Sequence, residues 1–227
     1  ISFQLHAGEI LGIAGLVGAG RSELAECIFG LSRPTTGEVY IRGKRVDFHH
    51  PQDSVRHRVA MITEDRKLTG LNLKASVEHN ITLVALSRLS RLGIIDSDKE
   101  AQVTDTYIKE LSIRTFSRKT LVANLSGGNQ QKVVLAKWLL TEPDIIIMDE
   151  PTRGIDVGAK RDIYLLMGSL AAAGKAILMV SSELPEIMGL ADRVIVLAAG
   201  NMTGELARHE FSQEAIMRYA SEFRQNG

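Results

Sequence analysis

The sequence predicts an α/β fold built on a mainly parallel sheet, and three observations lead to this prediction. Short apolar runs typical of buried strands alternate along the chain with stretches of helical spacing. A glycine-rich turn, Gly15–Ser22, stands between the first buried strand, Glu9–Ala14, and a helix. The apolar run Ile145–Met148 ends in two acids, as a buried parallel strand does when it delivers carboxylates at its carboxyl end.

Around the glycine-rich turn, the chain is predicted to form two strands and a helix. Ile1–Leu5 alternates apolar and polar residues like a half-buried strand, and the Glu9–Ala14 strand follows it. Ser22–Phe29 has the apolar spacing of a helix, and Gly30 is a favourable residue to end it. Cys27 falls on the apolar face of this helix, so we expect a small buried hydrophobe there.

The next segment predicts a hairpin, a short helix and a further strand. Glu38–Arg42 and Arg45–Phe48 flank Gly43, which predicts an antiparallel edge beside the strand that precedes the glycine-rich turn. Pro51 opens a short helix, and Val59–Ile62 is a buried strand.

A helical insert is predicted over about 72–140. Residues 75–120 carry helical spacing with little β signal, and a further helix is predicted to run to about Leu140. We therefore expect one domain over 1–227, with this helical subdomain inserted into its core.

The α/β alternation continues through the last third of the chain. The predicted elements after Asp156 are a helix closed by Gly174, a strand at Ala176–Val180, a helix at Pro185–Leu190, a strand at Arg193–Leu197, a hairpin turn at Ala199–Asn201 and a helix at Phe211–Ala220.

Composition bounds the function classes. The 227 residues include 27 Lys+Arg and 27 Asp+Glu, and a chain without net charge argues against a nucleic-acid partner. No apolar run reaches the length of a membrane span and no signal peptide is visible, which predicts a soluble, cytosolic chain. The chain begins at Ile1 within a strand-like alternation, so we interpret it as a piece of a longer protein.

Strand, glycine-rich turn and helix together predict a phosphate-binding loop. Backbone N–H groups of such a loop point at phosphate oxygens, and the helix N-terminus adds partial positive charge. Ser22 is placed to give its hydroxyl to Mg²⁺, whereas Arg21 stands where the pattern G-x-x-x-x-G-K-[S/T] has lysine. A dinucleotide-binding fingerprint is the alternative, but Glu23 occupies its third glycine position. The residues predicted to contact the nucleotide here are Gly15, Gly18, Ala19, Gly20, Arg21, Ser22 and Glu23.

The two acids at the end of the Ile145–Met148 run have distinct predicted roles. Asp149 can hold Mg²⁺ through water, opposite Ser22. Glu150 can orient or deprotonate the water that attacks a γ-phosphate, because phosphoryl transfer depends on positioning and charge neutralisation. Acids at strand ends are common, but together with the glycine-rich loop they predict a site for Mg²⁺ and ATP.

Leu125–Gln131, ahead of the acidic strand, resembles the ATP-binding cassette signature, which is usually LSGGQ. Ser126 and two glycines open a helix and leave N–H groups free for an anion; a plain Ser/Gly helix cap is the simpler alternative. The resemblance implies a head-to-tail pair of cassettes in which each signature covers the γ-phosphate of the partner. The residues that it adds to the nucleotide site are Ser126, Gly127, Gly128, Asn129, Gln130 and Asp156.

More narrowly, essentially the whole chain resembles the second, C-terminal nucleotide-binding half of the fused ATPases of bacterial carbohydrate importers of the ribose, galactose, xylose and arabinose type. The matching segments are Gly8–Gly12, Gly15–Glu23, Glu64–Lys67, Leu125–Lys132, Asp149–Asp156 and Ser181–Glu186. The resemblance implies ATP and Mg²⁺ as ligands and a role in sugar import. It also implies three partners: a first cassette in the same ATPase, membrane permease subunits and, indirectly, a periplasmic sugar-binding protein. The implied location is the cytoplasmic face of the bacterial inner membrane.

Three departures from an ordinary cassette predict a weakened hydrolytic site. Arg21 keeps the charge of the loop lysine but not its compact shape. Glu64 stands where cassettes carry a glutamine that touches Mg²⁺ and the membrane subunit, and Ser182 stands where they carry a histidine that contacts the γ-phosphate. Glu150 is retained, so the predicted catalytic residues are Glu150, Ser182 and Glu64. A regulatory module that does not hydrolyse ATP and a cassette ATPase unconnected with transport remain as alternatives.

Overall fold

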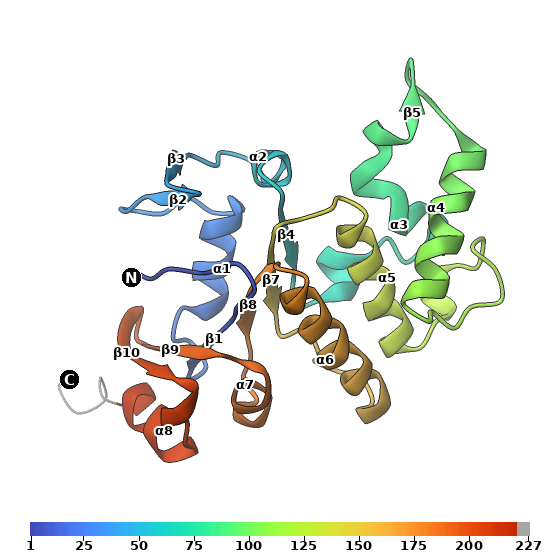
Figure 1. The fold of residues 1–227 in the computed structure, drawn as a ribbon. Coiled ribbons are helices and arrows are strands. Elements are labelled where there is room, and N and C mark those ends of the chain that lie inside the picture. Colours follow the sequence, from blue (N-terminus) through green and yellow to red (C-terminus); the bar gives the residue numbers. More distant parts are fainter. Residues whose placement is uncertain (222–227) are drawn as a thin grey trace. The chain divides into compact units, whose positions relative to one another are not determined.

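The computed structural model describes residues 1–221 (Figure 1). They divide into two compact units. Unit 1 comprises Ile1–Met61, Asp144–Glu150 and the described part of Leu166–Gly227, and unit 2 comprises Ile62–Pro143 and Pro151–Leu165.

Unit 1 contains the mainly parallel sheet that the sequence predicts. The strands, in spatial order, are β10 (Asn201–Ala207), β9 (Arg193–Ala198), β1 (Ile10–Gly15), β8 (Ala176–Val180), β7 (Ile145–Asp149) and β4 (Val59–Ile62). β1 is parallel to both β8 and β9, and β7 is parallel to β8. Their residues are almost all buried, because a parallel sheet is covered on both faces and its strands are apolar throughout. The α/β prediction is therefore confirmed.

Helices of unit 1 pack on this sheet. α1 (Arg21–Phe29) contacts β1, β7 and β8, whereas α7 (Leu184–Leu190) contacts β1. α8 (Gln213–Ser221) packs on β1, β9 and β10 through a face that includes Ile216 and Ala220. A short helix, α2 (Pro51–Arg56), begins at the predicted proline. The arrangement places the carboxyl ends of β1, β7 and β8 at one edge, where the candidate site lies.

Two predictions about unit 1 are wrong in detail. Residues 1–6 have no regular secondary structure, so the alternation of Ile1–Leu5 does not form a strand. A strand is stable only when a neighbour completes its hydrogen-bond ladder. Here Arg193 Nη2 donates instead to the Gln4 carbonyl (2.7 Å), and the His6 N–H donates to Glu9 Oε2 (2.8 Å). Cys27 is half-buried rather than buried, and its Sγ lies 3.1 Å from Ser32 Oγ.

The predicted hairpin exists but does not join the large sheet. β2 (Val39–Ile41) and β3 (Lys44–Val46) pair with each other in a sheet of their own. Arg42 and Gly43 both have positive φ, as in the tight turns that suit hairpins. The antiparallel edge near β1 comes from elsewhere, since β9 pairs with β1 and β10 runs antiparallel to β9.

Unit 2 is largely helical. Its elements are the π-helix η1 (Arg66–Gly70), α3 (Val77–Thr82), the 3₁₀ helix η2 (Leu83–Arg88), α4 (Ser97–Glu110), the 3₁₀ helix η3 (Val122–Asn124) and α5 (Gly127–Leu139). α6 (Val157–Ala172) has its residues up to Leu165 in unit 2 and the remainder in unit 1. The sequence did not predict a small hairpin of β5 (Ser90–Arg91) and β6 (Ile94–Ile95), because two-residue strands leave no readable alternation.

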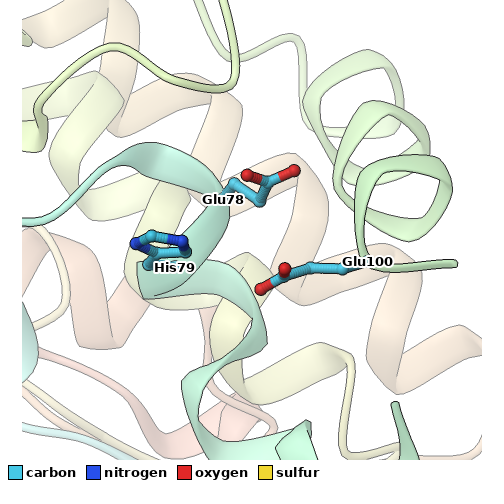
Figure 2. A group of neighbouring side chains, drawn as sticks. All are labelled: Glu78, His79 and Glu100. Carbon is cyan, nitrogen blue, oxygen red and sulfur yellow. The ribbon is translucent and has the colours of Figure 1, made fainter. Parts of the chain in front are cut away.

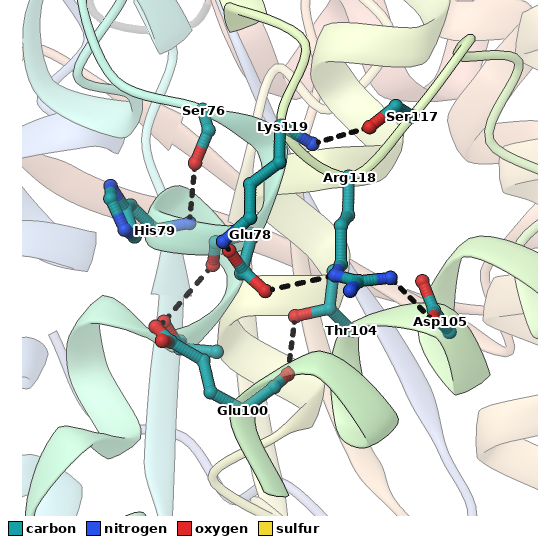
Figure 3. A network of polar contacts seen from close by, with 10 residues as sticks. Ser76, Glu78, His79, Glu100, Thr104, Asp105, Ser117, Arg118 and Lys119 are labelled. Atoms are coloured by element: carbon teal, nitrogen blue, oxygen red, sulfur yellow. Dashed lines mark hydrogen bonds and ion pairs between the residues drawn. The ribbon is translucent and has the colours of Figure 1, made fainter. Parts of the chain in front are cut away.

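Buried carboxylates join α3 and α4 in unit 2. Glu78, His79 and Glu100 lie close enough to suggest a metal site (Figure 2). Both carboxylates are already engaged, however, since Glu78 pairs with Arg118 and Lys119, and Glu100 accepts a 2.7 Å hydrogen bond from a threonine of α3 (Figure 3). Two cations neutralise the buried Glu78, so we interpret the cluster as a structural contact between α3 and α4.

The helices of residues 1–221 are each too short or too polar to span a lipid bilayer.

Candidate functional site

The glycine-rich loop joins β1 to α1 in a conformation that only glycine tolerates at two positions. Gly20, the residue before α1, has φ +93°, in the left-handed region that disfavours other residues. At Gly15, an added Cβ would lie 2.5 Å from the Leu197 carbonyl oxygen of β9. The loop is also tied to the turn after β9, because the Gly200 N–H donates to the Ala19 carbonyl (3.1 Å). The fold therefore dictates the backbone path of this loop.

The loop leaves the N-terminus of α1 open for an anion. In any helix the first N–H groups lack intrahelical partners, and Gly20 offers no side-chain cap. Glu23 is exposed in this first turn, and Gly18 lies where an added Cβ would meet nothing within 4 Å. Free N–H donors on a glycine-rich backbone are the arrangement that binds phosphate groups.

Asp149 ends β7 beside the hydroxyl of Ser22. The aspartate is 3% exposed, and its Oδ1 has no hydrogen-bond partner among the described residues. Burial raises its pKa to about 6; the nearby Glu150 acts in the same direction, whereas the Ser22 hydrogen bond and Arg21 lower the pKa. A buried carboxylate oxygen without a partner, next to a hydroxyl, fits a hard divalent cation such as Mg²⁺. These two residues are the predicted metal ligands.

Glu150 lies between two side chains of unit 1. Its Oε2 accepts a 3.0 Å hydrogen bond from Ser182 Oγ, and its Oε1 lies 3.7 Å from Arg21 Nη2. Glu150 has φ +46°, a left-handed conformation that costs a residue with a Cβ about 1–3 kcal/mol. Its N–H donates to the Val180 carbonyl (2.9 Å). The carboxylate is therefore held in one place at the end of the sheet.

Arg21 points toward this acid in the structure. Its Nη1 donates to the Ser181 carbonyl (2.7 Å), and its side chain is 11% exposed. The Ser181 hydroxyl in turn donates a hydrogen bond to Glu186 Oε2 (2.8 Å) and accepts one from the Glu183 N–H (3.0 Å). The guanidinium thus connects the glycine-rich loop to the segment that follows β8, a role that the loop motif alone does not suggest.

In unit 2 the signature segment forms the start of α5. Ser126 Oγ accepts hydrogen bonds from the N–H and the side-chain amide of Asn129, and Asn129 Oδ1 accepts from the Arg114 N–H (2.7 Å). At Gly128, an added Cβ would lie 2.5 Å from Ala159 Cβ of α6, so the glycine permits close packing of two helices. Gln130 is buried and donates to the Val122 carbonyl (3.2 Å), so its amide holds η3.

A cavity of about 610 Å³ adjoins the signature segment within unit 2. Four predicted site residues line it: Ser126, Gly128, Asn129 and Asp156. Asp156 Oδ1 accepts from the Ala159 N–H (2.9 Å) at the start of α6. Three cationic side chains and two carboxylates, those of Asp156 and Asp162, also line the cavity, so it can receive a polar group.

Sequence reasoning missed those three cations, Arg114, Lys132 and Arg161. Lys132 could have been predicted as a neighbour of the signature segment, since it follows Gly128 by four positions and Asn129 by three, and such positions share a helix face. It pairs with Asp162 at 2.8 Å. Arg114 and Arg161 lie in separate segments without a local motif.

The predicted site residues therefore fall into two groups. Unit 1 brings together the loop, Ser22, Asp149, Glu150 and Ser182. Unit 2 brings together the signature segment and Asp156. Glu64 belongs to unit 2 and forms an ion pair with Arg153 there.

Comparisons with known proteins identify the family. The family model described as "ABC transporter" matches residues 1–153. The chain is 48% identical, over 98% of its length, to a ribose import ATP-binding protein of Clostridium tetani, and 49% identical, over 97%, to a xylose import ATP-binding protein of Thermoanaerobacter pseudethanolicus. It spans about 44% of the length of each of these relatives.

Among solved structures, the fold is similar to that of an ATP-binding cassette described as a dimeric post-hydrolysis state bound to ADP and Pi. The TM-score is 0.79 at 24% identity, over 93% of this chain and 90% of that one. The family match, the relatives and the fold agree with the loop, the acidic strand end and the signature segment. The chain belongs to the ABC transporter family.

Proposed function

We propose that this chain is a nucleotide-binding domain that binds ATP with Mg²⁺ and hydrolyses it to power the import of a sugar. The observation that carries the proposal is the partnerless, buried Oδ1 of Asp149 beside Ser22, at the edge where the glycine-rich loop opens α1. The names of the relatives support the rest, since they are ribose and xylose import ATP-binding proteins.

The predicted site residues of unit 1 have distinct roles in this proposal. The backbone of Gly15–Gly20 and the first N–H groups of α1 bind the phosphates, with Ser22 and Asp149 as the residues that would hold Mg²⁺. When bound, Mg²⁺ neutralises charge on the β- and γ-phosphates. Glu150 orients the attacking water or accepts its proton, and Ser182 holds the Glu150 carboxylate at 3.0 Å.

The signature segment serves a second cassette. Because the loop already provides one phosphate site, the polar cavity beside Ser126, Gly128 and Asn129 is free to contact the nucleotide of a partner. We propose a head-to-tail pair with a first cassette of the same ATPase, so that this chain is one half of a two-cassette protein. The relatives support this, as the chain covers less than half of their length. Within that half we propose one domain over 1–227, with a helical subdomain over about 72–140.

The remaining partners follow from the same proposal. They are membrane permease subunits and, indirectly, a periplasmic sugar-binding protein. We propose no nucleic-acid partner. The proposed location of the domain is the cytoplasmic face of the bacterial inner membrane. Glu64 is proposed to contact the membrane subunit, in exchange for its ion pair with Arg153.

The hydrolytic site of this half is proposed to be attenuated. Arg21 contacts Ser181 and Glu150 in unit 1, so its guanidinium is engaged by the protein itself. A planar guanidinium also substitutes poorly for the compact ammonium of a lysine in such a loop. This observation favours, as a second candidate, a regulatory module that binds nucleotide without hydrolysing it.

An ATP titration beside a turnover assay tests the proposal. We expect the purified chain to bind ATP weakly, with affinity that increases with Mg²⁺, and to turn over below roughly 1 s⁻¹. Asp149→Asn should abolish the Mg²⁺ dependence, while a change at the exposed Lys44 in the β2–β3 hairpin should leave it intact. Binding without measurable turnover would favour the regulatory module, and absence of binding would contradict both candidates.

A further inference from the structure

Arg66, which begins the π-helix η1, is bonded to the loop between β7 and α6. Its Nη1 donates to the Arg153 carbonyl (2.8 Å) and its Nη2 donates to the Gly154 carbonyl (3.1 Å). All of these residues belong to unit 2. A guanidinium presents its donors in a rigid fork, so it can hold two successive carbonyls at once, whereas an ammonium holds them only as a point charge.

The same guanidinium fills the space beside the signature segment. At Gly127, an added Cβ would lie 2.7 Å from Arg66 Nη2 and 3.1 Å from the Gly154 carbonyl oxygen. A methyl group at Gly127 would therefore require the Arg66 guanidinium to shift, and that guanidinium is held by the Arg153 and Gly154 carbonyls. Arg66 lies between the signature segment and the loop that leads to Asp156.

η1 is anchored so that this arginine has little freedom. Asp65 Oδ1 accepts from the N–H groups of Lys67 (2.9 Å) and Leu68 (3.1 Å) at the start of the turn. At the other end, Lys137 Nζ of α5 donates to the Gly70 carbonyl. An added Cβ at Gly70 would lie 3.3 Å from the Val134 side chain, so η1 runs close against α5.

Arg66 also carries a cost that points to a geometric purpose. Its Nε is buried and has no hydrogen-bond partner among the described residues. Leaving a buried donor unpaired is unfavourable, so the position is held by the two carbonyl bonds and by the packing on Gly127. The adjacent, exposed ion pair of Glu64 and Arg153 joins the same two segments.

We propose that Arg66 is a positioning residue that sets the distance between the signature segment and the Pro151–Asp156 loop, and so shapes the polar cavity beside Ser126. The inference rests on the proposed function of that cavity, but the geometric part can be tested separately. Under the proposed function, Arg66 sets the position of the signature segment that contacts the partner's nucleotide.

Hydrogen exchange of the whole protein that carries this chain tests the geometric part. Loss of two hydrogen bonds should raise the exchange of amides in 153–156 and 126–129 by about tenfold in Arg66→Ala and by less in Arg66→Lys, whose single charged nitrogen can still donate to one of the two carbonyls. Lys67→Ala, a change at the exposed neighbour in η1, is the matched control and should leave both segments unchanged.

A double-mutant cycle with Gly127→Ala tests the packing. The new methyl group should lower the melting temperature more in the wild-type background than in Arg66→Ala, because that variant lacks the guanidinium with which the methyl group would clash. Equal losses in both backgrounds, or unchanged exchange in 126–129 and 153–156, would overturn the proposal.

ATPase kinetics separate this inference from the proposed function. If both hold, Arg66→Ala should lower kcat several-fold, leave KM for ATP near its original value, and be partly rescued in Arg66→Lys. If the wild-type protein neither binds nor hydrolyses ATP, the proposed function fails, and the exchange and melting data still decide whether Arg66 positions the loop.

Discussion

Ser182 Oγ donates a 3.0 Å hydrogen bond to Oε2 of Glu150, so the segment after β8 holds the acid that follows β7. The other oxygen, Oε1, lies 3.7 Å from Arg21 Nη2. The two carboxylate oxygens therefore contact two side chains of unit 1, Ser182 and Arg21, which come from separate parts of the chain. Under the proposed function, these contacts orient the acid and also compete with phosphate for the charge of Arg21.

Replacing Glu150 by Gln should slow ATP hydrolysis by about 10²–10⁴-fold with little loss of ATP affinity, because the amide keeps the shape but cannot accept a proton. Single-turnover kinetics beside an ATP titration measure both quantities. In the intact ATPase, the equivalent acid of the proposed first cassette provides the comparison. If only the first-cassette change silences transport, this half mainly holds nucleotide; equal loss from both changes would contradict an attenuated site.

Arg21→Lys should raise the turnover number of this site. The ammonium cannot bridge the Ser181 carbonyl and Glu150 as the guanidinium does, and it offers phosphate a compact charge. We expect an increase of about tenfold or more, up to the roughly 10²–10³-fold that one charge-stabilising donor contributes in other enzymes. Arg21→Ala serves as the control, since it removes both the contacts and the charge and should lower ATP affinity. Unchanged turnover in Arg21→Lys would mean that the arginine does not limit the site.

The pH dependence of stability should change when Asp149 is replaced by Asn. Burial raises the pKa of Asp149 to about 6 from its ordinary value of 3.8, so folding disfavours the charged form. The stability that this group contributes is fully present below about pH 4 and is lost as the pH rises through about 6. Thermal unfolding from pH 4 to 7 measures this, and Asp149→Asn should lack that component.

Mg²⁺ binding provides the converse test of Asp149. The ion competes with the proton for the buried carboxylate, so Mg²⁺-dependent ATP affinity should decline as the pH falls below about 6. A pH-independent Mg²⁺ effect would contradict Asp149 as a ligand. Titrations in the absence of Mg²⁺ control for changes in the nucleotide itself.

Replacing Ser126 by a bulky residue such as Phe should leave ATP binding by the purified chain intact but abolish transport by the full ATPase. Under the proposed function, the signature segment serves the partner's nucleotide, whereas the glycine-rich loop of unit 1 binds this chain's own ATP. Loss of the cap that Ser126 gives α5 costs about 1 kcal/mol, so Ser126→Thr, which keeps the hydroxyl, is the matched control. Collapse of ATP affinity in Ser126→Phe at unchanged melting temperature would contradict the assignment.

Local sequence signals predicted most elements and most candidate site residues. The apolar run of β7 and its terminal acids, the glycines of the loop and the serine cap of α5 act within a few residues, so their structural meaning is readable without the fold. The family resemblance followed from those same segments.

The first strand and the edge of the sheet were mispredicted because pairing is not local. Whether Ile1–Leu5 becomes a strand depends on a free neighbour, and β9 already occupies the edge of β1. The sequence reads alternation but not the partner that would complete a ladder.

The contacts of the charged residues depend on how distant segments of the chain come together. Arg21 and Ser182 converge on Glu150 because β1, β7 and β8 are neighbours in one sheet, and Arg66 reaches the Arg153 and Gly154 carbonyls across 87 and 88 positions of sequence. The glycine-rich loop, the acidic strand end and the capped helix, in contrast, could be predicted without the fold, since each depends on nearby residues. Which side chains meet depends on chain topology, because a hydrogen bond needs atoms about 3 Å apart and sequence spacing does not specify that distance for segments far apart in the chain.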